Sequence, residues 1–121
     1  MCVFCNISTS EAFLENLLAV ARWDKFPVNE GHVLIIPKRH VESYFDLETY
    51  EISALNELAY IAKKVIDVKF SPTGYNIGIN IGEAAGQTIN HVHMHLIPRY
   101  DGDIENPKGG IRNFKKALVE Y

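Results

Sequence analysis

The sequence predicts an α+β fold in which a mostly antiparallel sheet packs against one long helix. The helix is indicated over residues 46–70, where apolar side chains recur three and four positions apart and share one helical face: Leu55, Leu58, Ala59, Ala62, Val65 and Ile66. A strand is indicated over residues 75–81, because every second residue there is large and apolar. A change from helical to period-two spacing within one short chain is typical of this fold class.

Turn and cap residues divide the rest of the chain. Pro27 and Gly31 mark a loop before a short β-branched run, and Pro37 ends that run. Asp46 is the expected N-cap of the long helix, and Pro72 prevents the helix from continuing. The other expected elements are a short helix within residues 10–17, strands over 18–23, 32–36 and 89–97, an irregular stretch over 101–112 and a short helix from residue 113.

Length, charge and cysteine content limit the class of protein. The 121 residues suit a single domain over residues 1–121. Twelve basic against fifteen acidic residues leave a formal charge of −3, which argues against binding of nucleic acid. No apolar run reaches the ~20 residues of a membrane helix, so no membrane partner is expected. Two cysteines build no disulfide framework and no secretory signal is visible, which favours a reducing, cytoplasmic setting.

Three of the five histidines alternate with apolar residues late in the chain: His91, His93 and His95. On the strand expected over residues 89–97, alternate side chains point to the same face, so the three imidazoles are expected to lie together. The apolar residues between them would pack on the helix. Every buried imidazole nitrogen needs a partner, which makes this alternation hard to explain as packing alone. The segment is therefore the main candidate for a functional site.

A metal site is one interpretation of this spacing. Alternate residues lie ~6.6 Å apart along a strand, whereas His91 and His95 lie ~13 Å apart. Because Zn–N bonds are about 2.0–2.1 Å long, two of the histidines can share an ion, but all three only with strain. A metal-dependent phosphoesterase built on His91 and His93 stays an alternative, and the three histidines are expected to have different roles.

Nucleophilic catalysis at phosphorus is the other interpretation. A neutral imidazole can form a covalent phosphoramidate near pH 7, which divides one displacement into two easier steps. Neighbouring imidazoles can bind phosphate oxygens and assist the leaving group. The loop before the histidines contains Gly86-Gln87-Thr88, whose backbone N–H groups and hydroxyl suit a phosphate. The two features together favour phosphoryl chemistry.

Residues 86–97 and 29–40 resemble two blocks of the histidine triad (HIT) family, whose signature is His-φ-His-φ-His-φ-φ with φ apolar. The resemblance covers residues 2–100. It implies a HIT-like α+β fold with a mostly antiparallel five-stranded sheet, one long helix and a short N-terminal helix, and usually a homodimer whose sheets join. It also implies a hydrolase or transferase that cleaves at the α-phosphate of dinucleoside polyphosphates or nucleoside phosphoramidates through a covalent nucleotidyl-histidine intermediate.

The resemblance also implies roles for individual residues. His93 would be the nucleophile, His95 would contact the phosphate and the leaving-group oxygen, and His32 would complete the polar cluster. The nucleotide-binding positions are Asp24 for the ribose hydroxyls and, around the phosphate, Asn80, Gly86, Gln87 and Thr88. The base of a purine nucleotide would lie in an apolar pocket, for which the candidates are Phe4, Ile7, Leu18 and Trp23.

Cys2 and Cys5 form a C-x-x-C pair, which is half of a tetrahedral zinc site. The resemblance supplies two further ligands, His40 and His91. We therefore expect a structural Zn²⁺ that ties the N-terminus to the sheet and leaves His93 free, and no catalytic metal. A nucleotide-binding interaction module with little hydrolytic activity is the alternative from another class of protein.

Overall fold

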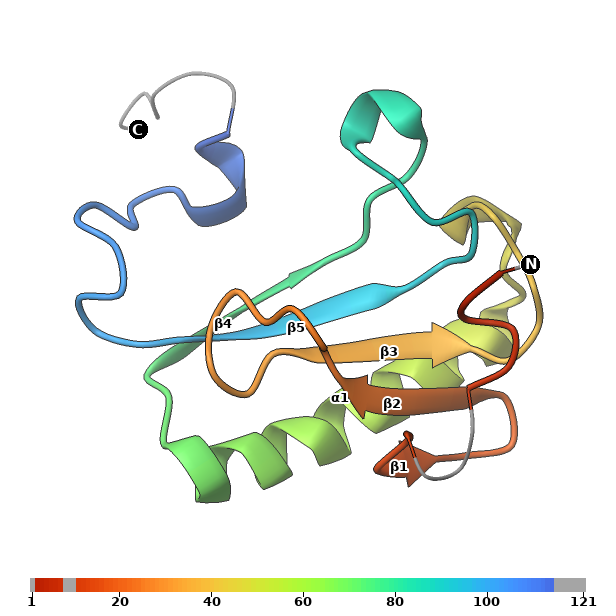
Figure 1. Cartoon of the computed structure of the whole chain (residues 1–121), viewed down its shortest axis with the longest axis horizontal. Helices are drawn as coiled ribbons and strands as arrows, with labels where there is room; N and C mark the ends of the chain where they lie inside the picture. The colour runs from red at the N-terminus through yellow and green to blue at the C-terminus, as the bar shows by residue number, and fades with distance from the viewer. Residues whose placement is uncertain (1, 8–10, 115–121) are drawn as a thin grey trace.

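The computed structural model describes residues 2–7 and 11–114, which form a five-stranded sheet with one long helix, α1 (Thr49–Phe70), on one face (Figure 1). Every neighbouring pair of strands is antiparallel. The strands lie in the order β1 (Leu14–Glu15), β2 (Ala19–Trp23), β3 (Val33–Pro37), β5 (Met94–Arg99) and β4 (Gly74–Gly78). The predicted α+β class, antiparallel sheet and long helix are confirmed.

Alternation along the strands separates two apolar layers. The helix-facing layer is the larger, and from the strands and the segment before β5 it contains Ala19, Ala21, Val33, Ile35, Val92, Met94 and Leu96. The opposite face of the sheet carries a smaller cluster of Val20, Leu34 and Ile36, covered by Phe4 from the N-terminal segment. The N-terminal residues thus close part of the face that α1 leaves open.

Helix α1 begins three residues after the expected N-cap. Asp46 instead ends a short 3₁₀ helix, η1 (Tyr44–Asp46), and Glu48 is the N-cap. The Glu48 backbone N–H donates to Glu51 Oε1 at 2.9 Å, which satisfies one of the unpaired donors at the helix start. The helix ends where Ser71 adopts the left-handed conformation, just before Pro72.

Two further expectations about strands and helices are wrong. The described part of residues 10–17 contains β1 and no helix, because the Asn16 side chain accepts hydrogen bonds from the backbone of Leu18 and Ala19 and closes a hairpin. Strand β4 ends at Gly78 and not at residue 81, because its pairing with β5 stops there. The helix expected from residue 113 falls mostly outside the described residues, and the stretch before it contains a short 3₁₀ helix, η3 (Gly110–Arg112).

Strand β5 also begins later than expected, at Met94 and not at residue 89. His91 and His93 therefore precede the strand. The ladder between β3 and β5 reaches Met94, which is opposite Ile35, and the Val92 N–H instead donates to Val41 O at 2.8 Å. The predicted alternation nevertheless holds, since Val92 packs in the helix-facing layer.

The loop between β2 and β3 depends on Gly31. This residue has φ of +87°, and a Cβ atom there would lie 2.9 Å from Phe70 Cδ2. Its close contact with the end of α1 and its positive φ both require glycine. The residue fixes the turn immediately before His32, whose N–H donates to Asn29 O at 3.1 Å.

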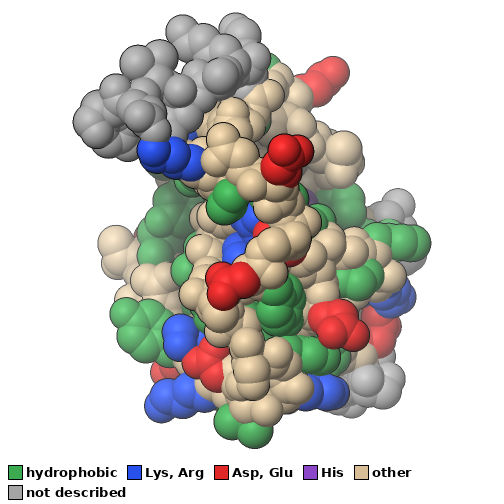
Figure 2. Space-filling model, turned by 90° about the vertical axis from the view of Figure 1, so that its left-hand side faces the viewer, with side chains coloured by type: hydrophobic (Ala, Val, Ile, Leu, Met, Phe, Trp, Pro, Cys, Tyr) green, Lys and Arg blue, Asp and Glu red, His purple; other side chains and the backbone are tan. Residues whose placement is uncertain are grey.

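The surface carries charges of both signs. On the face shown in Figure 2, the described Lys, Arg, Asp and Glu side chains are interspersed with hydrophobic ones and do not gather by sign. This face offers no continuous basic field of the kind that binds nucleic-acid phosphates. Within residues 2–7 and 11–114, no helix is both long and apolar enough to cross a membrane.

Candidate functional site

A cleft of about 920 Å³ lies on the face of the sheet opposite α1. Segments far apart in the chain build it: the N-terminal residues, the end of β2, the loop after β4 and the residues leading into β5. Six of the predicted nucleotide-binding and catalytic residues line it, namely Asp24, Asn80, Gly86, Thr88, His93 and His95. The fold therefore gathers most of the predicted site into one cavity.

The strand register explains this gathering. Arg22 of β2 is paired with Leu34 of β3, and Leu34 is paired with His95 of β5. Gly78 of β4 is the next partner in the same row. Directly paired residues of neighbouring strands point to the same face, so this row forms the floor of the cleft.

His93 is held by the chain immediately before it. Its Nδ1 lies 2.9 Å from the carbonyl oxygen of His91. A carbonyl only accepts hydrogen bonds, so Nδ1 carries the proton and Nε2 of the neutral ring carries the lone pair. The ring is 7% exposed and its centroid lies 5.1 Å from that of Phe4. The nitrogen suited to nucleophilic attack thus belongs to a fixed ring in the cleft wall.

His32 and His95 form a directed hydrogen-bond chain. The Val28 N–H donates to His32 Nδ1 at 3.1 Å, so that nitrogen carries no proton. The proton of neutral His32 is therefore on Nε2, which lies 3.0 Å from His95 Nδ1 and 3.3 Å from Asp24 Oδ2. Since His95 Nδ1 accepts this bond, the proton of neutral His95 is on Nε2. The Nε2–H of His95 can donate a hydrogen bond to a ligand.

Burial keeps these imidazoles neutral. It lowers the pKa of His95 to about 4, assisted by the neighbouring His93 and His32. It also lowers the pKa of His32, although the Asp24 carboxylate partly opposes this shift. A negatively charged phosphate in the cleft would act in the opposite direction, because an adjacent negative charge favours the protonated ring. A bound phosphate would therefore raise the pKa of His95 and increase the fraction of the ring that is protonated.

Gln87 is the predicted nucleotide-binding residue whose side chain does not line the cleft. Its Nε2 donates to Glu42 O at 2.8 Å and to Ile89 O at 3.0 Å, and its Oε1 accepts from Gly82 N at 2.9 Å. These bonds connect both ends of the 82–89 loop to the segment after β3. Gln87 thus shapes the loop that presents Gly86 and Thr88.

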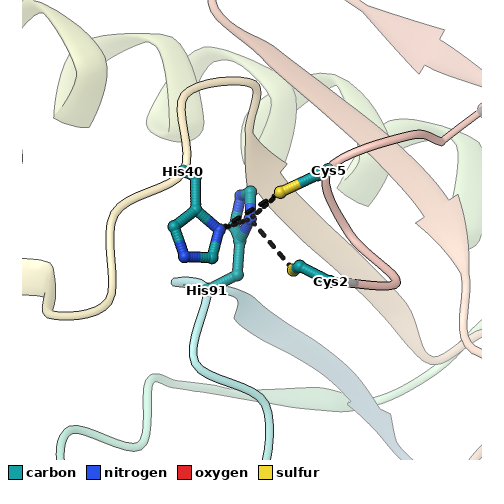
Figure 3. Close-up of side chains that lie close together, drawn as sticks. All are labelled: Cys2, Cys5, His40 and His91. Carbon is teal, nitrogen blue, oxygen red and sulfur yellow. Dashed lines mark hydrogen bonds between the residues drawn. The ribbon is translucent and has the colours of Figure 1, made fainter.

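The predicted zinc ligands form a second cluster beside the cleft. Figure 3 shows Cys2 and Cys5 from the N-terminal segment converging with His40 and His91, and their ligand atoms all lie within 4.8 Å of one another. Four of the separations are 3.5 Å for Cys2 Sγ–His91 Nδ1, 3.1 Å for Cys5 Sγ–His40 Nδ1, 3.7 Å for Cys5 Sγ–His91 Nδ1 and 3.2 Å for His40 Nδ1–His91 Nδ1. Ligand atoms of a tetrahedral zinc ion lie about 3.3–3.8 Å apart.

The hydrogen bonds of His91 fit the same interpretation. Its Nε2 lies 2.7 Å from Pro37 O and therefore carries the proton, so Nδ1 directs a lone pair toward the other three ligand atoms. The loop that carries His40 is held by Arg39, whose guanidinium bonds the buried Glu51 carboxylate at 2.6 and 3.1 Å. This bond to Arg39 also lowers the pKa of Glu51. The donor set and its supports fit a structural zinc ion.

Sequence reasoning missed part of the cleft wall. Arg22 and Glu11 line it, as does Phe4, which was only a candidate for the base pocket. Trp23, another candidate, faces the helix side, where it stacks on Phe13 with ring centroids 4.3 Å apart. The missed signal was the period of two along β2: Arg22 and Asp24 are two residues apart, so both side chains point to the cleft.

The fold and the cleft together define a class of small α+β proteins with a histidine-rich site on the open face of an antiparallel sheet. The family model of the HIT domain matches residues 7–102. An uncharacterized HIT-like protein of Methanocaldococcus jannaschii is 40% identical over 116 residues, which cover 91% of this chain and 88% of that protein. The chain belongs to the HIT family.

Relatives with an assigned activity are also similar. The bis(5'-adenosyl)-triphosphatase of Dictyostelium discoideum is 40% identical over 100 residues, covering 83% of this chain and 67% of that protein. Among solved structures, a HIT family protein from Bacillus anthracis superposes with a TM-score of 0.79 and 32% identity, covering 94% of this chain and 86% of that one. The family and the fold are therefore shown by sequence and by structure.

Proposed function

We propose that the protein is a nucleotidyl hydrolase that cleaves at the α-phosphate of dinucleoside polyphosphates or nucleoside phosphoramidates. One observation carries the proposal: the Nδ1–H of His93 is held by His91 O, so that an unprotonated Nε2 belongs to a ring in the wall of the cleft. The similarity to a dinucleoside triphosphatase supports this substrate class. A purine nucleotide is the expected ligand.

The first step transfers the nucleotidyl group to His93. Its Nε2 lone pair forms the bond to the α-phosphorus while the bond from phosphorus to the leaving oxygen or nitrogen breaks. The Nε2–H of His95 donates a hydrogen bond to the leaving atom, which departs as an anionic phosphate or as an amine that takes its proton from water, and the His32 bond to His95 Nδ1 holds that ring in place. Asn80, Gly86 and Thr88, which line the cleft, would surround the phosphate. In the second step water attacks phosphorus, the bond from phosphorus to His93 Nε2 breaks, the nucleoside monophosphate leaves and the proton of the water passes to solvent.

Asp24 has two contacts relevant to this proposal. Its Oδ1 accepts from Phe26 N at 2.9 Å, and its Oδ2 lies 3.3 Å from His32 Nε2. A carboxylate oxygen has two lone pairs, so both contacts leave capacity to accept the ribose hydroxyls. Asp24 would then bind the ribose and orient His32.

The cluster of Cys2, Cys5, His40 and His91 would hold a structural Zn²⁺. Such an ion would join the N-terminal segment to the sheet and so keep Phe4 in the cleft wall. Because the two cysteines must be free thiols or thiolates, we also expect a reducing, cytoplasmic setting. Metal analysis of the purified protein tests this part: about one zinc per chain is expected, and its absence would contradict it.

A second group of possible metal ligands, Asp24, His32 and His95, also brings ligand atoms within 4.8 Å of one another. Its hydrogen bonds favour catalysis over metal binding, because the His32 Nε2 proton lies between the two rings and no set of lone pairs converges on one point. We therefore expect no catalytic metal. Turnover that persists when chelator is present and the fold is intact would support this expectation, and its loss would favour the metal-dependent phosphoesterase.

A homodimer is the expected assembly. Strand β4 is an edge of the sheet, and Ile77 on it is 52% exposed. An apolar groove of about 360 Å³ lies beside it, where Tyr60 of α1 is also exposed. A second copy could pair its β4 here and continue the sheet. Light scattering should give twice the chain mass for the protein and the chain mass for Ile77→Asp; a monomeric wild type would contradict the proposal.

Intact-mass spectrometry after rapid quenching tests the catalytic proposal. Mixed with diadenosine triphosphate or adenosine 5′-phosphoramidate, the protein should gain the mass of one adenylyl group, and His93→Gln should gain none. His40→Gln is the matched control, because it removes an imidazole outside the cleft. An unmodified wild type that binds AMP but hydrolyses neither compound would instead indicate the binding module.

A further inference from the structure

Arg22 occupies an unusual place for a charged side chain. Its side chain is only 11% exposed, and its guanidinium carbon lies 5.2 Å from the centre of the Phe4 ring. Nη1 donates to Glu11 Oε2 at 3.3 Å. The buried Nε has no hydrogen-bond partner among the described residues, although the side chain lines the cleft. A buried N–H without an acceptor is unfavourable, so this donor is available to an acceptor of a ligand in the cleft.

The register places Arg22 at a defined distance from the phosphate end. Arg22 and His95 are two strands apart in the row that forms the cleft floor, which corresponds to about 9.5 Å between their Cα atoms. Asp24, on the same face of the chain, lies beside His32 and His95. A nucleotide with its phosphate at His93 and its ribose at Asp24 therefore extends its base toward Arg22. This step rests on the proposed function.

We propose that Arg22 reads the base and selects guanine over adenine. With Nη1 paired to Glu11, the edge formed by Nε and Nη2 is the part of the guanidinium left for a ligand. These two parallel donors match the O6 and N7 acceptors of guanine. Adenine presents only N7 as an acceptor on that edge and places its N6 amino donor opposite a guanidinium donor. The guanidinium thus distinguishes the two purines.

The surroundings of Arg22 fix this edge in place. Phe4 packs on the guanidinium and Glu11 holds one end of it. Glu11 also lies 3.5 Å from Lys25 Nζ, so the carboxylate is shared by two cations. Lys25 is exposed, with 62% of its side chain accessible, and therefore offers charge without a fixed orientation. Arg22 is the cation of this group whose geometry can recognise a base.

Binding of GMP and AMP by titration calorimetry tests the inference without any bond cleavage. The wild type should bind GMP between about fivefold and a hundredfold more tightly than AMP. Arg22→Met should bring the two affinities within about twofold of each other, mainly by weakening GMP. Arg22→Lys keeps the charge but not the fork, so it should also lose most of the ratio. Lys25→Met removes a charge near the same Glu11 and should leave the ratio unchanged.

Each contrary result has a separate meaning. Equal wild-type affinities for GMP and AMP, no measurable binding of either, or a ratio that Arg22→Met and Arg22→Lys both retain would overturn the role of Arg22. Hydrolysis of guanosine and adenosine 5′-phosphoramidates at equal kcat/KM, with the His93 adduct present, would overturn it and leave the proposed function intact. A guanine preference in binding without any adduct would support the role of Arg22 and overturn the proposed function.

Discussion

Two histidine clusters lie side by side in this protein. They differ in the hydrogen-bond partners of the imidazole nitrogens. In the cluster of Cys2, Cys5, His40 and His91, the carbonyl of Pro37 holds the His91 Nε2 proton, and Nδ1 presents a lone pair to its neighbours. In the cleft, donors and acceptors alternate from Val28 through His32 to His95. Converging lone pairs suit a metal ion, and alternating bonds suit proton transfer.

His91 belongs to both regions. Its ring joins the cysteine cluster, while its backbone oxygen accepts the Nδ1 proton of His93. The proposed zinc site and the proposed nucleophile thus use different atoms of one residue, the ring and the backbone oxygen of His91. The role of a histidine here follows from the hydrogen bond that one ring nitrogen makes, because that bond decides whether the other nitrogen carries a proton or a lone pair. Its position in the motif does not decide this.

The largest expected difference between the clusters is in turnover. His93→Gln should lower kcat/KM for diadenosine triphosphate by at least about a thousandfold, because the attacking nitrogen is lost. His40→Gln should change it by less than about tenfold, since His40 does not line the cleft. Steady-state kinetics on both variants measures this contrast. Similar losses in both would mean that the two regions do not have separate roles.

The next largest effect is on stability: removing the metal should lower the free energy of unfolding, whereas loss of His93 should not. At a free zinc concentration a thousand times Kd, a bound ion contributes about 4 kcal/mol to the free energy of unfolding. Chelation or Cys2→Ser should remove most of this contribution, whereas His93→Gln should not. Urea unfolding with and without zinc measures the difference. A curve for Cys2→Ser that overlays the wild type in both conditions would argue against the site.

A smaller effect is expected at the turn before His32. Gly31→Ala forces a side chain into a positive φ and to within 2.9 Å of Phe70, which should cost about 1–3 kcal/mol. The strain acts on the His32 side of the sheet, so catalysis should fall while zinc content stays the same. Thermal unfolding and metal analysis of one preparation test both parts. Unchanged stability would show that the loop adapts easily.

The smallest expected effect is on how the free energy of unfolding depends on pH. The pKa of His95 is lowered to about 4 in the folded protein from its ordinary value of 6.5, so the unfolded chain binds the proton first. The free energy of unfolding should therefore fall as pH drops from 6.5 toward 4, by less than about 1.4 kcal/mol per pH unit because the ring is partly exposed. His95→Gln should have a shallower slope in urea unfolding at pH 7, 6 and 5. Equal slopes would assign the dependence to other groups.

The sequence predicted those features that local spacing determines. The face of α1 follows from apolar periodicity, and the separation of His91 from His95 follows from strand geometry, which correctly gave them different surroundings. Contacts across the sheet could not be predicted in this way. The bond between His32 and His95, the late start of β5 and the arrival of Arg22 beside Phe4 all depend on how distant strands align.

Phe4 lies where the two regions meet: it packs in the cluster on the open face of the sheet and contacts the rings of both His91 and His93. Cys2 and Val3 line the cleft next to it. Because Cys2 lines the cleft, an affinity tag attached ahead of it would begin close to the proposed nucleotide site. Kinetic and calorimetric preparations should have that extension cleaved off, since it could compete with ligand for the entrance.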